Sequence, residues 1–254
     1  MRLDTYGCGC EHDCKYCYAK SLLSFRKLWD AQDPAVANIK DIEKVVKKLK
    51  KGTIIRLGGM TDCFQPLELK YRITYKTIEL LNKYDIGYLI VTKSHLVANE
   101  EYMKLYRKDL AHIQITITTL DDDLSLTYEK ASIPTKRVEA LLKLQDEGFD
   151  VSVRLSPIID EYMDYEKLNS LGIKKAIVEF LRVNTWIKKW FNIDYSKYVL
   201  KQSSYRFMRL NDKKKIIEKI KIPEISVCED YSPHYKYWEV NVNHNRKDCC
   251  NLRR

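Results

Sequence analysis

Apolar positions along the chain follow two alternating patterns. Between residues 35 and 50, apolar side chains recur every three or four positions with lysines between them, which predicts an amphipathic helix. The same spacing predicts helices over residues 71–83, 100–107 and 135–147. Continuous apolar runs between these segments predict buried strands over residues 53–57, 87–92, 113–118, 151–155 and 175–180.

This alternation predicts the fold class. Buried strands separated by helices are typical of α/β proteins with a parallel sheet, and right-handed crossovers curl such a sheet into a full or partial barrel. After residue 182 the pattern weakens to a basic helix over residues 213–221 and a short strand over residues 225–228. We therefore expect a core over residues 1–182 and a C-terminal extension over residues 183–254 that packs on or near the barrel mouth.

Composition narrows the class of protein. The 254 residues are 45% hydrophobic and 31% charged, which excludes a disordered chain. No window approaches the roughly 18 uninterrupted apolar residues of a membrane-spanning helix. The first residues contain charges and cysteines where a signal peptide needs an apolar run. We therefore expect a cytoplasmic protein without a membrane partner; the pattern leaves its oligomeric state open.

The charge balance points to a class of partner. The formal net charge is +10, and the chain contains 18 Tyr. Lys and Arg pair with phosphates and aromatic rings stack on bases, so this composition favours nucleic acid or nucleotides as partners. A basic surface that only keeps the protein in solution is the alternative.

A cysteine motif near the N-terminus is the most informative segment. Cys10, Cys14 and Cys17 form a C-x3-C-x2-C pattern. Three thiolates on one tight loop can hold three irons of a cubane [4Fe–4S] cluster and leave the fourth iron open for substrate. A zinc site with His12 as fourth ligand is an alternative, although zinc sites usually have two separated C-x2-C pairs. A structural disulfide is disfavoured in a protein that is not secreted.

This motif resembles the signature of the radical S-adenosylmethionine (SAM) superfamily, with Tyr16 as the aromatic residue before the last cysteine. The resemblance implies a partial (β/α)6 TIM-like barrel, a [4Fe–4S] cluster on Cys10, Cys14 and Cys17, and SAM on the open iron. It further implies that an external electron donor such as flavodoxin or ferredoxin reduces the cluster. Reductive cleavage of SAM would then give a 5′-deoxyadenosyl radical that abstracts hydrogen from a substrate.

Further segments lie at residues 9–19, 60–68, 91–94, 116–119 and 154–159. In their order and spacing over residues 5–160 they resemble the spore photoproduct lyase-like branch, also called DNA-repair-photolyase-like. Each lies at or just beyond the C-terminal end of a predicted strand, where barrel active sites form. The resemblance implies these cofactor contacts: Gly58 and Gly59 at the SAM amino group; Thr61, Asp62 and Lys93 on SAM; Tyr16 and Tyr18 beside the cluster or on adenine; and Thr118 and Arg154 as further candidates. Arg154 interrupts an apolar strand, so we expect it to face the barrel mouth with an anionic partner.

The remaining cysteines are candidates for donating a hydrogen atom to the substrate radical. The lesion-repair enzymes of this branch have a hydrogen-donating cysteine just before the segment matched by Thr61 and Asp62, where this chain has Gly59 or Met60. This departure argues against specific repair of a thymine dimer, whereas lyase chemistry and DNA repair in general stay among the functions that the resemblance implies. The candidate catalytic cysteines are Cys63, Cys249 and Cys250. We also expect residues 231–254 to cross the barrel mouth and bring a thiol of Cys228, Cys249 or Cys250 toward the cluster.

The sequence therefore predicts a radical SAM enzyme of the lyase or modification type whose substrate is nucleic acid or nucleotide-like. One alternative is a radical SAM enzyme that modifies a peptide or small metabolite. Another, of a different class, is a non-catalytic nucleic-acid-binding module with a structural zinc.

Overall fold

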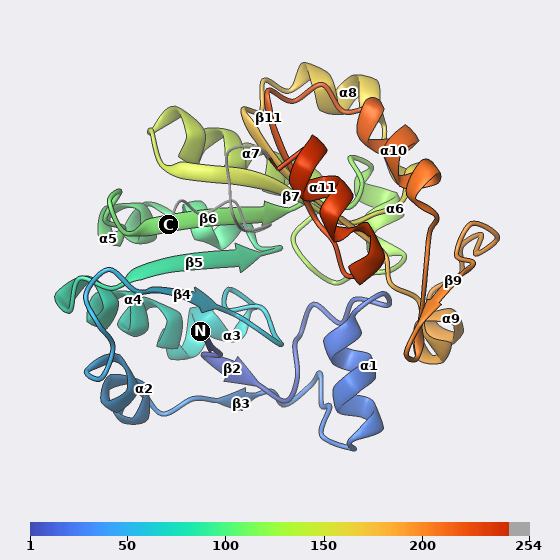
Figure 1. Cartoon of the computed structure of the whole chain (residues 1–254). Helices are drawn as coiled ribbons and strands as arrows, with labels where there is room; N and C mark the ends of the chain where they lie inside the picture. Colours follow the sequence, from blue (N-terminus) through green and yellow to red (C-terminus); the bar gives the residue numbers. More distant parts are fainter. Residues whose placement is uncertain (244–254) are drawn as a thin grey trace.

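A computed structural model describes residues 1–243 of the chain. Its centre is a seven-stranded sheet in the order β1-β4-β5-β6-β7-β8-β11, and every neighbouring pair is parallel (Figure 1). The strands are β1 (Arg2–Leu3), β4 (Ile54–Leu57), β5 (Gly87–Thr92), β6 (Ala111–Thr116), β7 (Asp150–Ile158), β8 (Lys175–Phe180) and β11 (Glu224–Cys228).

Helices connect and cover these strands. The larger ones are α1 (Tyr18–Phe25), α2 (Ile39–Val46), α4 (Ile73–Lys83), α7 (Pro134–Asp146) and α10 (Leu210–Glu218). Shorter ones are α3 (Leu67–Tyr71), α5 (Glu100–Leu105), α6 (Asp122–Leu126), α8 (Tyr165–Ser170), α9 (Thr185–Trp190) and α11 (Tyr235–Asn241). Two small antiparallel ribbons pair β2 (Tyr6–Gly7) with β3 (Ala35–Val36) and β9 (Leu200–Gln202) with β10 (Tyr205–Phe207). In residues 1–243 no helix is both long and apolar enough to cross a membrane.

The predicted fold class, a partial barrel with a parallel sheet, is confirmed. Strands 87–92 and 175–180 have the predicted bounds, and the other three differ by a few residues at their ends. The helix predicted from residue 35 begins only at Ile39, because Ala35 and Val36 pair with β2 instead. The segment after residue 182 contributes β11 to the same sheet, beside β8. It also contains the short helix α11, which the sequence pattern did not indicate.

Side chains on the strands alternate between two environments. In β4, Ile55 and Leu57 are fully buried in the core, whereas Arg56 between them faces the interior of the barrel. The same alternation turns Arg154 and Ser156 of β7 into the barrel. Apolar side chains therefore hold the helices on the outside, and polar ones remain for the inside.

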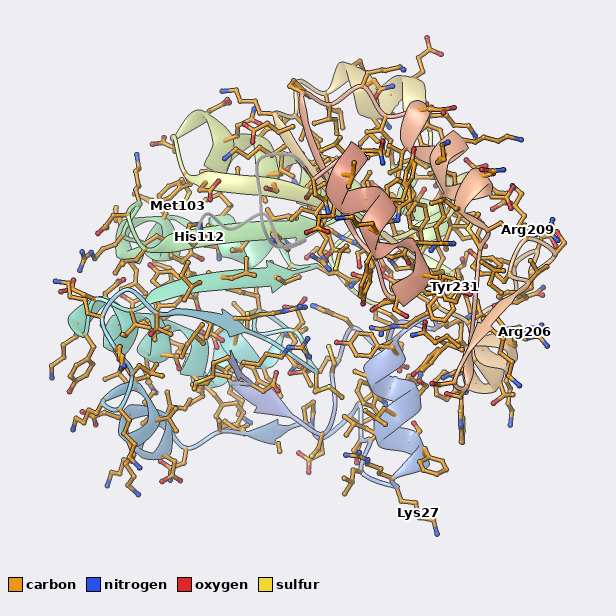
Figure 2. All side chains as sticks on the ribbon, in the orientation of Figure 1. Lys27, Met103, His112, Arg206, Arg209 and Tyr231 are labelled. Carbon is orange, nitrogen blue, oxygen red and sulfur yellow. The ribbon has the colours of Figure 1, made fainter. Side chains whose placement is uncertain are left out.

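The two ends of the barrel differ. At the amino-terminal end of the strands, Asp150 joins His112 (Nδ1 to Oδ2, 2.7 Å) and Lys175 (Nζ to Oδ1, 2.6 Å) across three strands; Figure 2 labels His112 at this end. These contacts link adjacent strands through a hydrogen bond and an ion pair. The carboxyl-terminal end of the strands contains two cavities.

Candidate functional site

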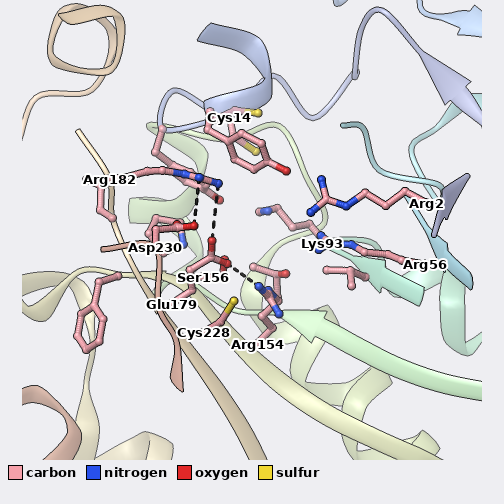
Figure 3. A pocket seen from close by; sticks show the side chains of 18 residues that line it. Arg2, Cys14, Arg56, Lys93, Arg154, Ser156, Glu179, Arg182, Cys228 and Asp230 are labelled. Atoms are coloured by element: carbon pink, nitrogen blue, oxygen red, sulfur yellow. Dashed lines mark hydrogen bonds and ion pairs between the residues drawn. The ribbon is translucent and has the colours of Figure 1, made fainter. Parts of the chain in front are cut away.

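Two adjoining cavities lie at the carboxyl ends of the strands. The larger has a volume of about 290 Å³ and the smaller of about 110 Å³. Both are lined by Cys14, Cys17, Tyr18, Arg56, Val91, Lys93 and Thr116, so they form one continuous hollow. Figure 3 shows the side chains that line the larger cavity. Carboxyl ends of parallel strands are where α/β barrels place their ligands.

The cysteine loop forms one wall of this hollow. Cys10, Cys14 and Cys17 all line the smaller cavity. Backbone turns shape the loop, with the Cys17 N–H donating to the Cys14 carbonyl over 3.2 Å. Cys17 also caps α1, since its sulfur accepts from the Lys20 N–H at 3.3 Å. The fold thus turns three thiols that lie within eight residues of sequence toward one space.

These thiols fit a cubane cluster better than one metal ion. In the described part of the chain, no group of three His, Cys, Asp or Glu side chains is arranged to hold a metal ion. A cubane needs a different arrangement, because each thiolate binds its own iron. Burial, with a smaller contribution from nearby Asp62, raises the pKa of the Cys10 thiol to about 12. A bound metal reverses this preference by stabilising the thiolate.

A buried charge network supports the loop from behind. The Tyr16 hydroxyl donates to Glu129, and Glu129 pairs with the fully buried guanidinium of Arg137. The Cys14 sulfur lies 3.9 Å from the same carboxylate. Thr118 belongs to this network, with its hydroxyl 2.9 Å from that of Tyr128, and lines neither cavity.

Asp62 joins three segments around the smaller cavity. Its carboxylate accepts hydrogen bonds from the Phe64 N–H (2.8 Å), the Thr92 hydroxyl (2.7 Å) and the Lys93 N–H (2.7 Å). His12 Nε2 lies 3.3 Å from Oδ2 of the same carboxylate. Burial alone would raise the pKa of Asp62, but His12 and these hydrogen bonds lower it to about 2. The carboxylate therefore stays charged and holds the cysteine loop against the ends of β4 and β5.

The two glycines after β4 allow a close backbone approach. Gly58 has a φ of +75°, and a Cβ there would lie 2.7 Å from the Thr61 carbonyl oxygen. The Gly59 N–H donates to the Asp4 carboxylate at 2.5 Å, and the Gly59 carbonyl accepts from the Tyr18 hydroxyl at 2.9 Å. Both glycines line the smaller cavity, as does Thr61, whose hydroxyl donates to the Tyr6 carbonyl.

Lys93 supplies a cation to both cavities. Its ammonium lies 5.5 Å from the centre of the Tyr16 ring and forms no ion pair with a carboxylate in residues 1–243. Burial opposes the charge on Lys93, but Cys14, Glu129 and Asp62 together raise its pKa. An ammonium that is in an ion pair with no carboxylate of the described residues is available to a ligand.

The opposite wall comes from β7, β8 and the segment after β11. Arg154 donates to Gln114 at 2.9 Å and to Glu179 at 2.5 Å, so Glu179 is the anionic partner expected for it. Arg182 pairs with Asp230 at 3.2 Å (Figure 3). Burial would raise the pKa of Glu179, but Arg154, Ser156 and Arg182 lower it to about 2. The pKa of Asp230 is raised to about 6, chiefly by burial.

The candidate catalytic cysteines lie in different places. Cys63 is fully buried in the core and lines neither cavity. Cys249 and Cys250 fall outside the described residues. Cys228, at the end of β11, lines the larger cavity together with Cys14 and Cys17.

Sequence reasoning did not single out several residues of the hollow. These are Arg2, Arg56, Thr116, Ser156, Glu179, Arg182 and Asp230. A polar side chain inside an apolar strand could have indicated them, because alternate positions of a strand face opposite sides. Arg56 within Ile54–Leu57 and Glu179 within Lys175–Phe180 are examples.

Comparison with known proteins identifies the family. The model of the radical SAM superfamily matches residues 5–169. The chain belongs to the radical SAM superfamily. It is therefore an enzyme with the superfamily fold. The chain is also 26% identical over 231 residues to an uncharacterized protein of Methanocaldococcus jannaschii, covering 86% of this chain and 85% of that protein. An uncharacterized protein of Acidianus two-tailed virus is 24% identical over 219 residues, covering 77% and 70%.

Solved structures confirm the fold of this radical SAM enzyme. A spore photoproduct lyase variant with bound AdoMet and a dinucleoside spore photoproduct has a TM-score of 0.66 at 16% identity, covering 89% of this chain and 75% of that one. SuiB of Streptococcus suis bound to S-adenosylmethionine has a TM-score of 0.57 at 12% identity, covering 90% and 50%. The predicted likeness to the photoproduct lyase branch thus holds for the fold.

Proposed function

We propose that this radical SAM enzyme binds a [4Fe–4S] cluster through Cys10, Cys14 and Cys17 and SAM in the adjoining hollow. When bound, the reduced cluster and SAM supply a 5′-deoxyadenosyl radical, which abstracts hydrogen from a substrate. The observation that carries the proposal is that the three thiols line one cavity at the carboxyl ends of the strands, beside Lys93, a cation without an ion pair in residues 1–243.

The protein's own residues position the cofactor in this proposal. The Lys93 ammonium pairs with the SAM carboxylate, as a charge-assisted contact. The close backbone approach at Gly58 and Gly59 receives the SAM amino group. Asp62 acts through its hydrogen bonds to the β5 end, which fix the Lys93 backbone. Arg154, held by Glu179, and the rings of Tyr16 and Tyr18 bound the space for adenosine.

The proposed substrate is nucleic acid or nucleotide-like, in keeping with the net charge of +10. A reducing partner such as flavodoxin or ferredoxin supplies the electron. Cys228 is the thiol at the end of β11 that faces the larger cavity. In the proposal it gives a hydrogen atom to the substrate radical. The thiyl left behind returns to the thiol by taking one electron from the reducing partner and one proton from solvent.

Anaerobic reconstitution with iron and sulfide tests the proposal. We expect broad absorbance near 400 nm, a property of cubane clusters, and formation of 5′-deoxyadenosine and methionine from SAM under reductant. Incubation with oligonucleotides, peptides and small metabolites, followed by mass spectrometry, then identifies the substrate class. Product formed only from a peptide or metabolite would replace the nucleic-acid part of the proposal. A colourless protein that binds zinc would overturn it entirely.

A further inference from the structure

One wall of the larger cavity has cations that form no ion pair with a carboxylate of the described residues. Arg2 of β1 and Arg56 of β4 line it beside Lys93, and all three point into the cavity from the same side in Figure 3. None of them forms an ion pair with a carboxylate within residues 1–243. On the facing wall, by contrast, Arg154 and Arg182 are paired with Glu179 and Asp230.

The strand register holds the two arginines side by side. Arg2 and Arg56 are partners in the parallel pairing of β1 with β4. Like charges at facing strand positions destabilise a sheet. The fold keeps this pair at an open cavity mouth, where an anion between the guanidinium groups would offset their repulsion.

The glycines after β4 orient both side chains. A Cβ on Gly59 would lie 2.9 Å from Cδ of Arg2, so the stem of Arg2 packs directly on the Gly59 backbone. The Arg56 Nε donates to the Gly58 carbonyl at 3.1 Å. The two terminal amino groups of Arg56 take no part in this bond. Both guanidinium groups are thus held from behind, and their free edges face the cavity.

We propose that Arg2 and Arg56 form a phosphate-binding site that holds a backbone phosphate of a single nucleic-acid strand whose adjacent nucleotide enters the cavity. This inference rests on the proposed function and specifies how its substrate is held. Guanidinium forks match phosphate oxygens bidentately, and two unpaired cations suit a phosphate better than a single carboxylate. A base pair of a duplex does not fit inside a cavity of about 290 Å³, so the nucleotide that enters it is unpaired.

Binding of a fluorescent single-stranded oligonucleotide to the reconstituted enzyme tests the proposal. We expect the Arg2→Gln/Arg56→Gln variant to weaken binding about tenfold or more, equally for different base sequences. The slope of log affinity against log salt should fall by about 0.7, the change for one phosphate contact on a single strand. Arg56→Lys, which keeps the charge but loses the fork, should weaken binding less than Arg56→Gln.

The matched control removes the same charge elsewhere. Lys40 and Lys48 are exposed on and just after α2 and form no ion pair with a described carboxylate. Lys40→Gln/Lys48→Gln should leave both affinity and salt slope near those of the unaltered enzyme. An equal loss in this control would show that only total charge matters and would overturn the proposal.

Competition experiments with the unaltered enzyme test the proposal even if the variants fail to fold. A peptide nucleic acid of the same sequence has no phosphates, so we expect it not to compete with the oligonucleotide. Competition by this probe at equal concentration would overturn the proposal. Competition by inorganic phosphate or a nucleoside monophosphate alone, as strong per molecule as by the strand, would mean that the site binds a free phosphate compound and would also overturn it. SAM cleavage by the same preparation without oligonucleotide tests the proposed function separately.

Discussion

The wall formed by residues 10–17 and the ends of β4 and β5, together with the charge network behind it, holds its carboxylates in buried contacts. Asp62 accepts three hydrogen bonds, and Glu129 lies between Tyr16 and a fully buried Arg137. The wall formed by β7, β8 and the segment after β11 contains one buried pair, Arg154 with Glu179, and one looser pair, Arg182 with Asp230, whose side chains are each about one quarter exposed. Here one carboxylate oxygen, Oδ2 of Asp230, has no hydrogen-bond partner in the described residues.

This difference indicates how one site can hold a cofactor in a fixed position and still adapt to its substrate. Preorganised charge positions a cofactor without reorganisation during reaction. A wall with partly exposed charges and a titratable acid can adapt to a substrate at lower cost. The superfamily match over residues 5–169 covers the first wall, whereas β11 and Asp230 lie beyond it. We infer that the part of the second wall beyond this match contributes to the choice of substrate.

The largest expected effect comes from removing the thiols of the first wall. Changing Cys10, Cys14 and Cys17 together to Ala should abolish iron binding at this site and all reductive SAM cleavage, because no protein ligand for the cluster remains there. Iron analysis and chromatography of 5′-deoxyadenosine measure both. The matched control, Cys8→Ala, alters an exposed cysteine that lines neither cavity. SAM cleavage by the triple variant would contradict the assignment.

A second effect compares arginines from the two walls. Arg137→Met leaves the buried Glu129 carboxylate without its cation, so we expect the free energy of unfolding to fall by about 3–5 kcal/mol. Arg182→Met breaks a partly exposed pair with Asp230 and should cost about 1 kcal/mol or less. Urea denaturation measures both values. Equal losses would remove the distinction between the buried pair behind the first wall and the partly exposed pair of the second wall.

A double variant separates charge burial from packing. Glu129→Leu/Arg137→Met removes both charges, so it should destabilise the protein less than Arg137→Met alone. If the double variant is the less stable of the two, the loss reflects packing and the uncompensated charge is not its cause.

A third effect concerns the unpaired cation of the first wall. Lys93→Met should weaken SAM binding by about 1–3 kcal/mol, the range for losing a charge-assisted contact. Calorimetric titration with SAM measures the change. Lys93→Arg keeps the positive charge and should recover part of the affinity, whereas Lys40→Met on α2 should change nothing. Unchanged affinity in Lys93→Met would mean that another group holds the SAM carboxylate.

The strands and the cysteine loop could be read from the sequence because both signals are local. Continuous apolar runs define β5 and β8, and three closely spaced cysteines define the loop. Contacts between distant segments were not readable in this way. The pairing of Arg2 with Arg56 depends on the parallel register of β1 and β4.

Strand ends account for two residues whose surroundings the sequence did not reveal. Thr116 and Thr118 share one strand face by alternation, yet β6 ends at Thr116, and the chain then turns Thr118 onto the network around Glu129. Cys63 lies one residue from Asp62 but points into the core, where it is fully buried. A shift of one residue in where a strand ends decides whether a side chain faces the cavity or the core, and sequence patterns do not locate strand ends to one residue.

The smallest effect distinguishes two carboxyl groups of the second wall by pH. Asp230 has a pKa raised from 3.8 to about 6, chiefly by burial, whereas the pKa of Glu179 is lowered from 4.5 to about 2, with Arg154 the strongest influence opposing its burial. Between about pH 6 and 4 the folded protein therefore binds a proton at Asp230 that the unfolded chain does not. The contribution of Asp230 to the free energy of unfolding should rise as the pH falls through this window. The stabilisation that the charged Glu179 carboxylate contributes changes in the opposite direction, since it is lost as the pH falls below about 4.5 toward 2.

Carbon NMR of the side-chain carboxyls should show one titration near pH 6 that disappears in Asp230→Asn. It should persist in Glu161→Gln, which alters an exposed acid outside the cavity. A midpoint for Asp230 below pH 4 would mean that Arg182 holds it as firmly charged as Asp62, and the two walls would no longer differ in this respect.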